Sequence, residues 1–258
     1  MDKRKKRIVG CVLILVLCLT ASPASSQETI RIATGEYPPL LGENLSDHGI
    51  GGHLVSEAYA TMGIRVRYGY FPWIRAKHYM ESNSNEWDAS GVWFKNEERV
   101  KVFHFSEPVL DMNMVFFHLR SKTFDWDTLA DLRGLKIGAV SSATGGDQFD
   151  SWEKEKKLKV TRGDEDIQLF KMLLRGRIDV TLANSIFGRF LLRENLTPEE
   201  TALVTFHPKP LFSKPLHLIF SKENPKTQYW LDAFDKGLKK LKDSRKYHKI
   251  VEGELLPK

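Results

Sequence analysis

Residues 98–108 read ERVKVFHFSEP and join a charged cluster to a short extended segment that ends at a proline. Arg99 lies inside the charged cluster, which runs from Glu97 to Lys101. Its guanidinium presents a planar pair of donors that matches a carboxylate, and it stays charged at any ordinary pH. From these residues alone, the expected role of Arg99 is an exposed surface charge of this cluster.

Strand-like and helix-like segments alternate on both sides of this stretch. Alternating and β-branched residues predict strands at 29–34, 65–71, 87–93, 102–105, 112–119, 136–140, 179–183 and 216–221. Apolar residues at helical spacing predict helices at 53–62, 73–80, 128–132, 166–174, 186–193 and 228–241, with another that begins near Asp147. The alternation predicts an α/β protein with largely parallel sheets.

The chain has no internal repeat and no low-complexity linker. If it folds as two lobes, ordered strands must therefore join them. The extended segments 116–120 and 212–218 are the two candidates for these crossovers.

The N-terminus has the order of a secretory signal peptide, which predicts that residues 1–26 are removed on export. A basic head at 3–7 precedes an almost wholly apolar run at 8–19, and small residues follow it. The run is too short for a membrane-spanning helix, which needs about 20 apolar residues. We expect cleavage near Ser26–Gln27; an uncleaved N-terminal anchor is the alternative.

This segment also holds both cysteines, Cys11 and Cys18, so the mature protein is expected to contain no disulfide and no cysteine metal site. Neither cysteine has the surroundings of a lipid attachment site, which favours a soluble secreted protein. Loss of five basic residues and Asp2 lowers the formal net charge from +6 to +2. No basic run remains, so no nucleic-acid binding is expected. The eight histidines lack metal-ligand spacing, and we expect no metal and no cofactor.

Short motifs follow one another along residues 28–252 in an order typical of one family. They are Glu36-Tyr37-Pro38-Pro39, Gly51-Gly52, Glu57-Ala58-Tyr59, Pro72-Trp73-Ile74-Arg75-Ala76, Trp87-Asp88-Ala89, the stretch 98–108, Asp131-Leu132-Arg133-Gly134-Leu135-Lys136-Ile137-Gly138 and Gly176-Arg177-Ile178-Asp179-Val180. With these motifs the chain resembles the periplasmic solute-binding proteins of the polar-amino-acid type, bacterial extracellular solute-binding protein family 3, which serve as receptors for ATP-driven importers.

The resemblance implies an α/β fold of the type II periplasmic-binding-protein class. Two α/β lobes would be joined by two crossover strands, with a ligand cleft between them. Lobe 1 would comprise residues 27–117 and 217–258, and lobe 2 would comprise residues 118–216.

The resemblance also implies ligand-binding roles for particular residues. Arg99 would grip a ligand carboxylate, and Thr144, in a small-residue loop before a helix, would contact the same group. The free backbone N–H groups of such a loop form a ready anion site; a plain helix cap by Thr144 or Ser142 is the alternative. Tyr37 resembles the aromatic residue that covers the ligand, and Trp73 would line the same side.

Two positions depart from the amino-acid binders of the family. The strand before Arg99 ends in Trp93 and Phe94 in place of serine or threonine hydroxyls. Trp93 would form an aromatic wall suited to a less polar ligand, unless both rings belong to the core. Asn184 stands where an aspartate usually pairs with the ammonium group of the ligand. Either another carboxylate, such as Glu36, meets that group, or the ligand lacks one.

The implied function is that of a monomeric periplasmic receptor. It would close on a small polar ligand, an amino acid or related small carboxylate, and deliver it to an inner-membrane ABC permease. Hinge closure is a known property of periplasmic binding proteins and is taken over from the resemblance. No catalytic residue is expected. The alternatives are a ligand-sensing partner of a membrane receptor, and a dehydratase-like enzyme on the same fold with Glu36 as its general acid.

Overall fold

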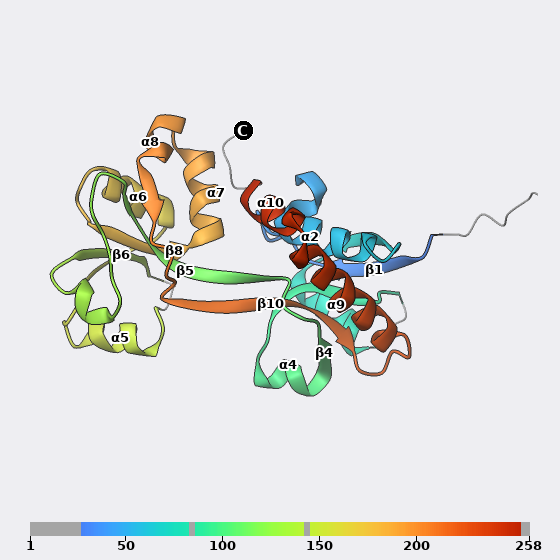
Figure 1. The fold of residues 1–258 in the computed structure, drawn as a ribbon. Helices are drawn as coiled ribbons and strands as arrows, with labels where there is room; N and C mark the ends of the chain where they lie inside the picture. The colour runs from blue at the N-terminus through green and yellow to red at the C-terminus, as the bar shows by residue number, and fades with distance from the viewer. Residues whose placement is uncertain (1–26, 83–85, 142–144, 254–258) are drawn as a thin grey trace, which may run out of the picture.

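One continuous sheet runs through the molecule and carries both of its lobes (Figure 1). The computed structural model describes residues 27–82, 86–141 and 145–253, so the expected signal peptide and Thr144 lie outside the described residues. The strands are β1 (Thr29–Thr34), β2 (Arg65–Tyr70), β3 (Ala89–Phe94), β4 (Phe103–Phe105), β5 (Leu110–Leu119), β6 (Lys136–Val140), β7 (Lys159–Gly163), β8 (Val180–Asn184), β9 (Val204–Phe206) and β10 (Phe212–Ser221). Their order in the sheet is β2-β1-β3-β10-β5-β8-β6-β7, with β4 paired to β10 and β9 to β5.

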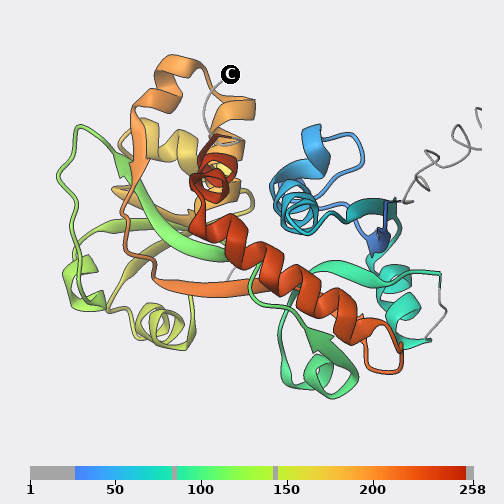
Figure 2. The same cartoon turned by 45° about the vertical axis from the view of Figure 1, so that its right-hand side comes forward.

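Helices cover this sheet in both lobes. They are the 3₁₀ helices η2 (Ser46–His48) and η3 (Leu129–Leu132), and the α-helices α2 (Gly49–Ala60), α3 (Trp73–Glu81), α4 (Glu97–Val102), α5 (Asp147–Lys154), α6 (Asp166–Leu174), α7 (Ser185–Asn195), α8 (Pro198–Ala202), α9 (Thr227–Asp243) and α10 (Arg245–Gly253). The first lobe carries α2, α3, α4, α9 and α10, and the second carries α5 to α8 (Figures 1 and 2).

Two long strands, β5 and β10, join the lobes. They pair with each other in antiparallel fashion, from Leu110 opposite Leu216 to Met114 opposite Phe212. Beyond this pair, β10 continues alongside β3 and β4, while β5 continues alongside β8 and β9. The first crossover therefore lies earlier in the chain than the expected segment 116–120, whereas the second falls within the expected 212–218.

The sheet is parallel within each lobe and antiparallel where the lobes meet. β1 runs parallel to β2 and β3, and β6 runs parallel to β7 and β8. Every pairing of β5 and β10 is antiparallel. The expectation of largely parallel sheets is correct for the β–α units and wrong for the joining strands. The reason is topological: the chain crosses to the second lobe once and must return beside its own outward path.

The core of the first lobe is closed by α9, which packs on α2. Four large apolar residues at helical spacing are buried on one face of α9: Trp230, Phe234, Leu238 and Leu241. The ring of Phe234 lies 5.3 Å from that of Tyr59 on α2. A Cβ atom at Gly237 would lie 2.1 Å from the carbonyl oxygen of Ala58, so glycine permits this close approach of the two helices. Helix α9 thus shares a core with the N-terminal strand β1.

The second lobe has a core on each side of its sheet. Successive residues of a strand point to opposite faces of the sheet, so two consecutive phenylalanines of β5 enter different cores. Phe116 packs on Trp126, with ring centroids 5.3 Å apart, in the cluster that also contains Phe149 of α5. Phe117 packs on Phe170 of α6, with centroids 5.1 Å apart, in the cluster on the other face.

The stretch 98–108 forms most of α4, all of β4 and the turn that fastens them to β10. The Ser106 hydroxyl accepts a hydrogen bond from the Leu218 amide at 3.0 Å. The Ser106 carbonyl lies 2.7 Å from Nδ1 of His217, and because a carbonyl only accepts, Nδ1 carries the proton. Burial lowers the pKa of His217, which agrees with a neutral ring. These bonds hold the first lobe to β10 beside the crossover.

Several short elements were not predicted, and each of the following buries few or no side chains. Neither α4 nor α8 contains a buried residue, α10 buries only Ile250, and β7 is exposed or half-buried along its length. The helix predicted at 53–62 begins earlier, at Gly49, because the glycine-rich turn before it packs on backbone. The Gly51 amide donates to the carbonyl of Leu40 at 2.8 Å, a close approach that a pattern of apolar residues does not reveal.

Candidate functional site

Arg99 stands on the first turn of α4, and the turn before it fixes its position. The side-chain oxygen of Asn96 caps the helix by accepting from the Arg99 amide at 2.9 Å. The half-exposed guanidinium lies 4.9 Å from the centre of the Trp93 ring and donates to the Phe94 carbonyl at 2.8 Å. Among the described residues no carboxylate lies within ion-pair distance of it. This charge is therefore held in place while most of its donors remain available to an anion.

Trp93 connects Arg99 to the rest of the predicted site. It ends up almost fully buried, 8% exposed, near the end of β3, and its indole N–H donates to the hydroxyl of Ser90 at 2.9 Å. Its ring meets that of Trp73 edge-on, with centroids 4.9 Å apart. Trp93 is thus a core residue that also supports the arginine, and its role as a wall of the ligand cleft stays a prediction.

Trp73 and Tyr37 continue the row towards the second lobe. The Trp73 indole donates to the backbone carbonyl of Glu36 at 3.2 Å, and its ring meets Tyr37 edge-on at 6.5 Å. Tyr37 is half-buried, and burial raises the pKa of its hydroxyl, so it remains a hydrogen-bond donor at neutral pH. The Tyr37 ring lies 4.9 Å from that of Phe187, which belongs to α7 of the other lobe.

Asn184 joins this row from the second lobe as the N-cap of α7. Its side-chain oxygen accepts from the backbone amides of Ile186 at 2.9 Å and Phe187 at 3.2 Å. The side-chain NH₂ contacts the sulfur of Met112 at 3.8 Å. Because backbone amides only donate, the capping bonds fix which end of the amide is the oxygen. The group that Asn184 has left to offer a ligand is a donor.

The Glu36 carboxylate is bound by a backbone amide that does not belong to this row. One carboxylate oxygen accepts from the amide of Glu43 at 3.0 Å, and the residue is exposed. Its charge also contributes to the raised pKa of Tyr70, whose main cause is burial. A general acid needs burial or a like charge to raise its pKa, so this exposed carboxylate does not favour the dehydratase alternative.

The loop expected to bind an anion is only partly described, since Thr144 lies outside the described residues. At its end, the Gly145 amide donates to the carboxylate of Asp150 at 3.0 Å, so α5 satisfies this N–H with one of its own side chains. The six predicted ligand residues that are described form one chain of contacts: Arg99, Trp93, Trp73, Glu36, Tyr37 and, through Phe187, Asn184.

Sequence reasoning missed three residues that hold this site together. Phe187 closes the row from the second lobe, Ser90 orients Trp93, and Asn96 places Arg99. Asn96 had a readable signal, because asparagine directly before the first residue of a helix is a preferred N-cap. Phe187 had none, since its partner Tyr37 is distant in sequence. Ser90 lies only three residues before Trp93, but the strand pattern does not show that its hydroxyl accepts from the indole N–H.

The sequence of this chain matches a known family. The profile of the bacterial extracellular solute-binding proteins, family 3, covers residues 30–253. The chain belongs to this family.

Solved structures of binding proteins share the fold of this solute-binding protein. The L-cystine solute receptor of Neisseria gonorrhoeae, in its unliganded open conformation, is 18% identical over 89% of this chain and 94% of that chain, with a TM-score of 0.72. A substrate-binding protein of a polar amino acid ABC uptake transporter from Streptococcus thermophilus is 18% identical over 87% and 85%, also with a TM-score of 0.72.

A third structure, the second substrate-binding domain of a putative amino acid ABC transporter from Streptococcus pneumoniae, is 16% identical over 88% of this chain and 100% of that chain, with a TM-score of 0.71. These likenesses establish the type II periplasmic-binding-protein fold, as predicted. No curated protein matches the chain. The family and these structures are binding proteins.

Two further features concern the described part of this solute-binding protein. No helix in it has the length and apolar character to cross a bilayer. It also contains no group of three or more histidine, cysteine, aspartate or glutamate residues placed to hold a metal ion.

Replacing Gly35 by alanine is expected to push the Trp73 indole out of the row. A Cβ atom at Gly35 would lie 2.4 to 2.6 Å from three atoms of that ring, and such overpacking costs about 1–3 kcal/mol. We expect a changed near-ultraviolet circular dichroism spectrum and weaker ligand binding. Gly91→Ala is the matched control, because its Cβ would meet neighbours at 3.5 Å or more. Equal spectra and affinities for the two variants would contradict the placement of Trp73.

Proposed function

We propose that this solute-binding protein is a periplasmic receptor that binds a small carboxylate-bearing solute between its lobes and delivers it to an ABC importer. The observation that carries this proposal is the row from Arg99 through Trp93, Trp73 and Tyr37 to Phe187. The row begins at a cation of the first lobe and ends on the second. A ligand held along it contacts both lobes and therefore stabilises the arrangement in which they are close.

The ligand class follows from the two polar groups at either end of this row. Arg99 offers a planar fork of donors, and the Asn184 side chain offers an NH₂ donor because its oxygen caps α7. Both ends therefore favour acceptors on the ligand, such as a carboxylate, and neither favours an ammonium group. Of the two readings left open by the sequence, this supports a ligand without an ammonium group at Asn184, and the outward position of Glu36 agrees.

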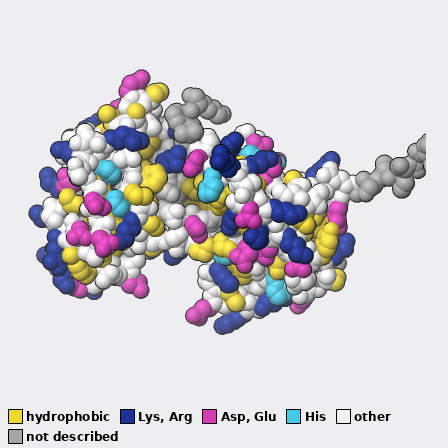
Figure 3. Space-filling model, viewed as in Figure 1, with side chains coloured by type: hydrophobic (Ala, Val, Ile, Leu, Met, Phe, Trp, Pro, Cys, Tyr) yellow, Lys and Arg dark blue, Asp and Glu magenta, His cyan; other side chains and the backbone are white. Residues whose placement is uncertain are grey.

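The further parts of the proposal rest on the family and on the chain order. The receptor is proposed to be exported by cleavage of residues 1–26 and to act as a monomer. Its lobes are proposed to be 27–117 with 217–258, and 118–216, joined by β5 and β10. The space-filling view is hollowed between α5 and α4, beneath these two strands, which leaves room for the lobes to move together (Figure 3).

The role as a receptor is tested by native mass spectrometry of gently purified protein, followed by solution scattering. We expect mass spectrometry to detect a small bound molecule. Unfolding and refolding the protein should release this molecule. When it is added back to the ligand-free protein, the radius of gyration should decrease. A ligand-free sample whose scattering does not change with any small carboxylate at saturating concentration would count against the receptor role.

Asn184→Asp is expected to keep the helix cap and to weaken binding of the carboxylate ligand. Aspartate caps as well as asparagine does, so the unfolding free energy should change little. In aspartate a second, negatively charged oxygen stands in place of the NH₂ donor of asparagine. The hydrogen bond from this donor to the ligand carboxylate is then lost, and loss of a hydrogen bond to a charged group lowers affinity by about tenfold or more. The measurement is a thermal-shift screen of small carboxylates against their α-amino derivatives.

Asn195→Asp, at the exposed C-terminal end of the same helix, is the control for the change in charge. In this variant the thermal shifts with the plain carboxylates and with their α-amino derivatives should equal those of the unmodified protein. A stronger response of the unmodified protein to the α-amino derivatives than to the plain carboxylates would contradict the proposed ligand class.

A further inference from the structure

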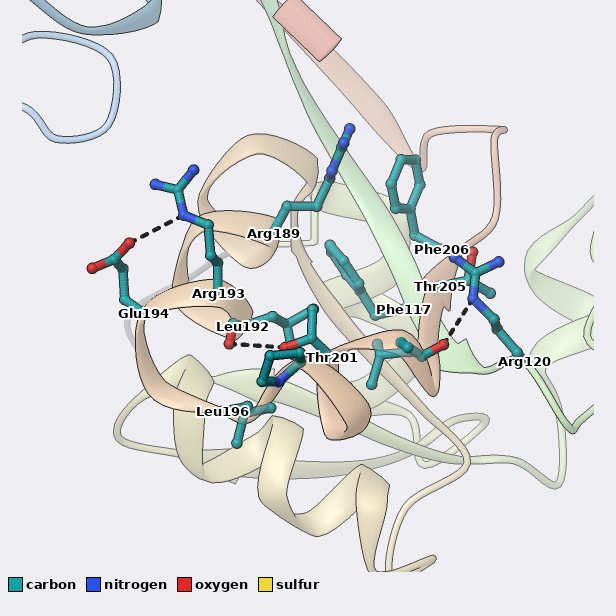
Figure 4. A pocket seen from close by; sticks show the side chains of 13 residues that line it. Phe117, Arg120, Arg189, Leu192, Arg193, Glu194, Leu196, Thr201, Thr205 and Phe206 are labelled. Carbon is teal, nitrogen blue, oxygen red and sulfur yellow. Dashed lines mark hydrogen bonds and ion pairs between the residues drawn. The ribbon is translucent and has the colours of Figure 1, made fainter. Parts of the chain in front are cut away.

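A pocket of about 760 Å³ lies within the second lobe, between α7, α8 and β9. None of the six described residues of the predicted site lines it. Its volume is within the range of about 300–1,000 Å³ that is typical of small-molecule sites. Figure 4 shows Phe117 and Leu192 towards its centre, with the side chains of Arg120, Arg189 and Arg193 around them.

The lining has an apolar part and a basic part. Phe117, Leu192 and Val204 contribute aromatic and aliphatic surface from three different elements. Three arginines also line the pocket, against a single acidic residue, Glu194. Arg193 donates to Glu194 at 3.1 Å. The pocket therefore has an excess of positive charge beside apolar walls.

Arg189 is the arginine on which a ligand would depend most. It is half-buried, and among the described residues no carboxylate lies within ion-pair distance and no hydrogen bond is made by its guanidinium. Burial lowers its pKa, and the charge of Glu252 on α10 offsets this only in part. A cation taken partly out of water without a partner is stabilised by an anion brought next to it.

We propose that this pocket is a second ligand site, which binds a carboxylate with an apolar chain, with the carboxylate on Arg189 and the chain on Phe117, Leu192 and Val204. The site is separate from the row at Arg99 and goes beyond the proposed function. Both sites share α7, because Asn184 caps this helix and Arg189 lies on its second turn. An occupant of the pocket therefore contacts the same helix that carries Phe187 to Tyr37.

The proposal is tested by calorimetric titration of the mature protein with octanoate and with 1-octanol, which has the same chain length and no charge. Octanoate is expected to bind more tightly. Arg189→Gln should weaken octanoate by about tenfold or more and leave 1-octanol within about twofold, because only the charged contact is removed. Arg175→Gln, an exposed arginine of the same lobe outside the pocket, should change neither affinity.

Two more variants separate this pocket from the rest of the molecule. Ala202→Trp places a bulky ring on the exposed rim of the pocket and should abolish binding of both probes without disturbing the core. The same titrations repeated in an Arg99→Ala background should show losses of the same size for Arg189→Gln and Ala202→Trp, which keeps this test independent of the proposed receptor role. Unchanged octanoate affinity on adding Arg189→Gln or Ala202→Trp to that background would overturn the proposal.

Discussion

Replacing Arg99 by alanine is expected to weaken ligand binding by about 30-fold to several thousand-fold. Removing one partner of a charge-paired contact that is largely desolvated costs about 2–5 kcal/mol, at about 1.4 kcal/mol for each tenfold change. The structure favours such a contact because the guanidinium is already held by Trp93 and the Phe94 carbonyl. Less of its side-chain entropy remains to be lost when the ligand binds.

The measurement is isothermal titration calorimetry with the molecule that copurifies. Arg99→Lys should recover only part of the affinity, because an ammonium group offers no paired fork and stacks less well on Trp93. Lys101→Ala, an exposed cation on the same helix, is the matched control and should change affinity by less than about 1 kcal/mol. If Arg99→Ala behaves like Lys101→Ala, Arg99 is a surface charge and the carboxylate anchor must be sought elsewhere.

Replacing Phe234 by alanine is expected to lower the free energy of unfolding by about 3–5 kcal/mol, the usual cost of removing a buried phenylalanine. Phe234 is fully buried in the core that joins the N-terminal strands to α9, and it packs on Tyr59. The change therefore tests whether residues after 217 stabilise the first lobe, as the proposed division of the chain requires.

Urea unfolding followed by circular dichroism measures this effect. Lys236→Ala, on the exposed face of the same helix, should stay within about 0.5 kcal/mol of the unmodified protein. Hydrogen exchange should then show lost protection in α2 and β1, and less change in α6. Greater loss of protection in α6 than in α2 would contradict the assignment of α9 to the first lobe.

Much of the fold was predictable because its signals are local. The strand at 29–34 and the helix at 166–174 have the predicted bounds, since apolar residues in them recur at the period of their own backbone. The order of motifs along the chain led to the type II periplasmic-binding-protein fold, which the family match and the solved structures confirm. The antiparallel crossover strands departed from the prediction, because strand direction depends on which distant segment lies alongside.

The candidate site divides in the same way. The resemblance to the family indicated Arg99 as an anion binder and Asn184 as a change in the ligand's environment. The structure added that Asn184 uses its oxygen as a helix cap and that the Glu36 carboxylate turns towards Glu43. Those facts depend on side-chain orientation, which a one-dimensional pattern does not contain. The roles of these residues in binding remain predictions.

The amino-acid sequence alone was sufficient for the class of fold, the order of its main elements and the chemistry available at Arg99. Each of these depends on neighbours along the chain or on the nature of a single side chain. The contact of Tyr37 with Phe187 and the basic pocket around Arg189 depended on the tertiary structure. They bring together segments far apart in the sequence, and their spacing is set by strand pairing and core packing, which leave no periodic trace in the chain.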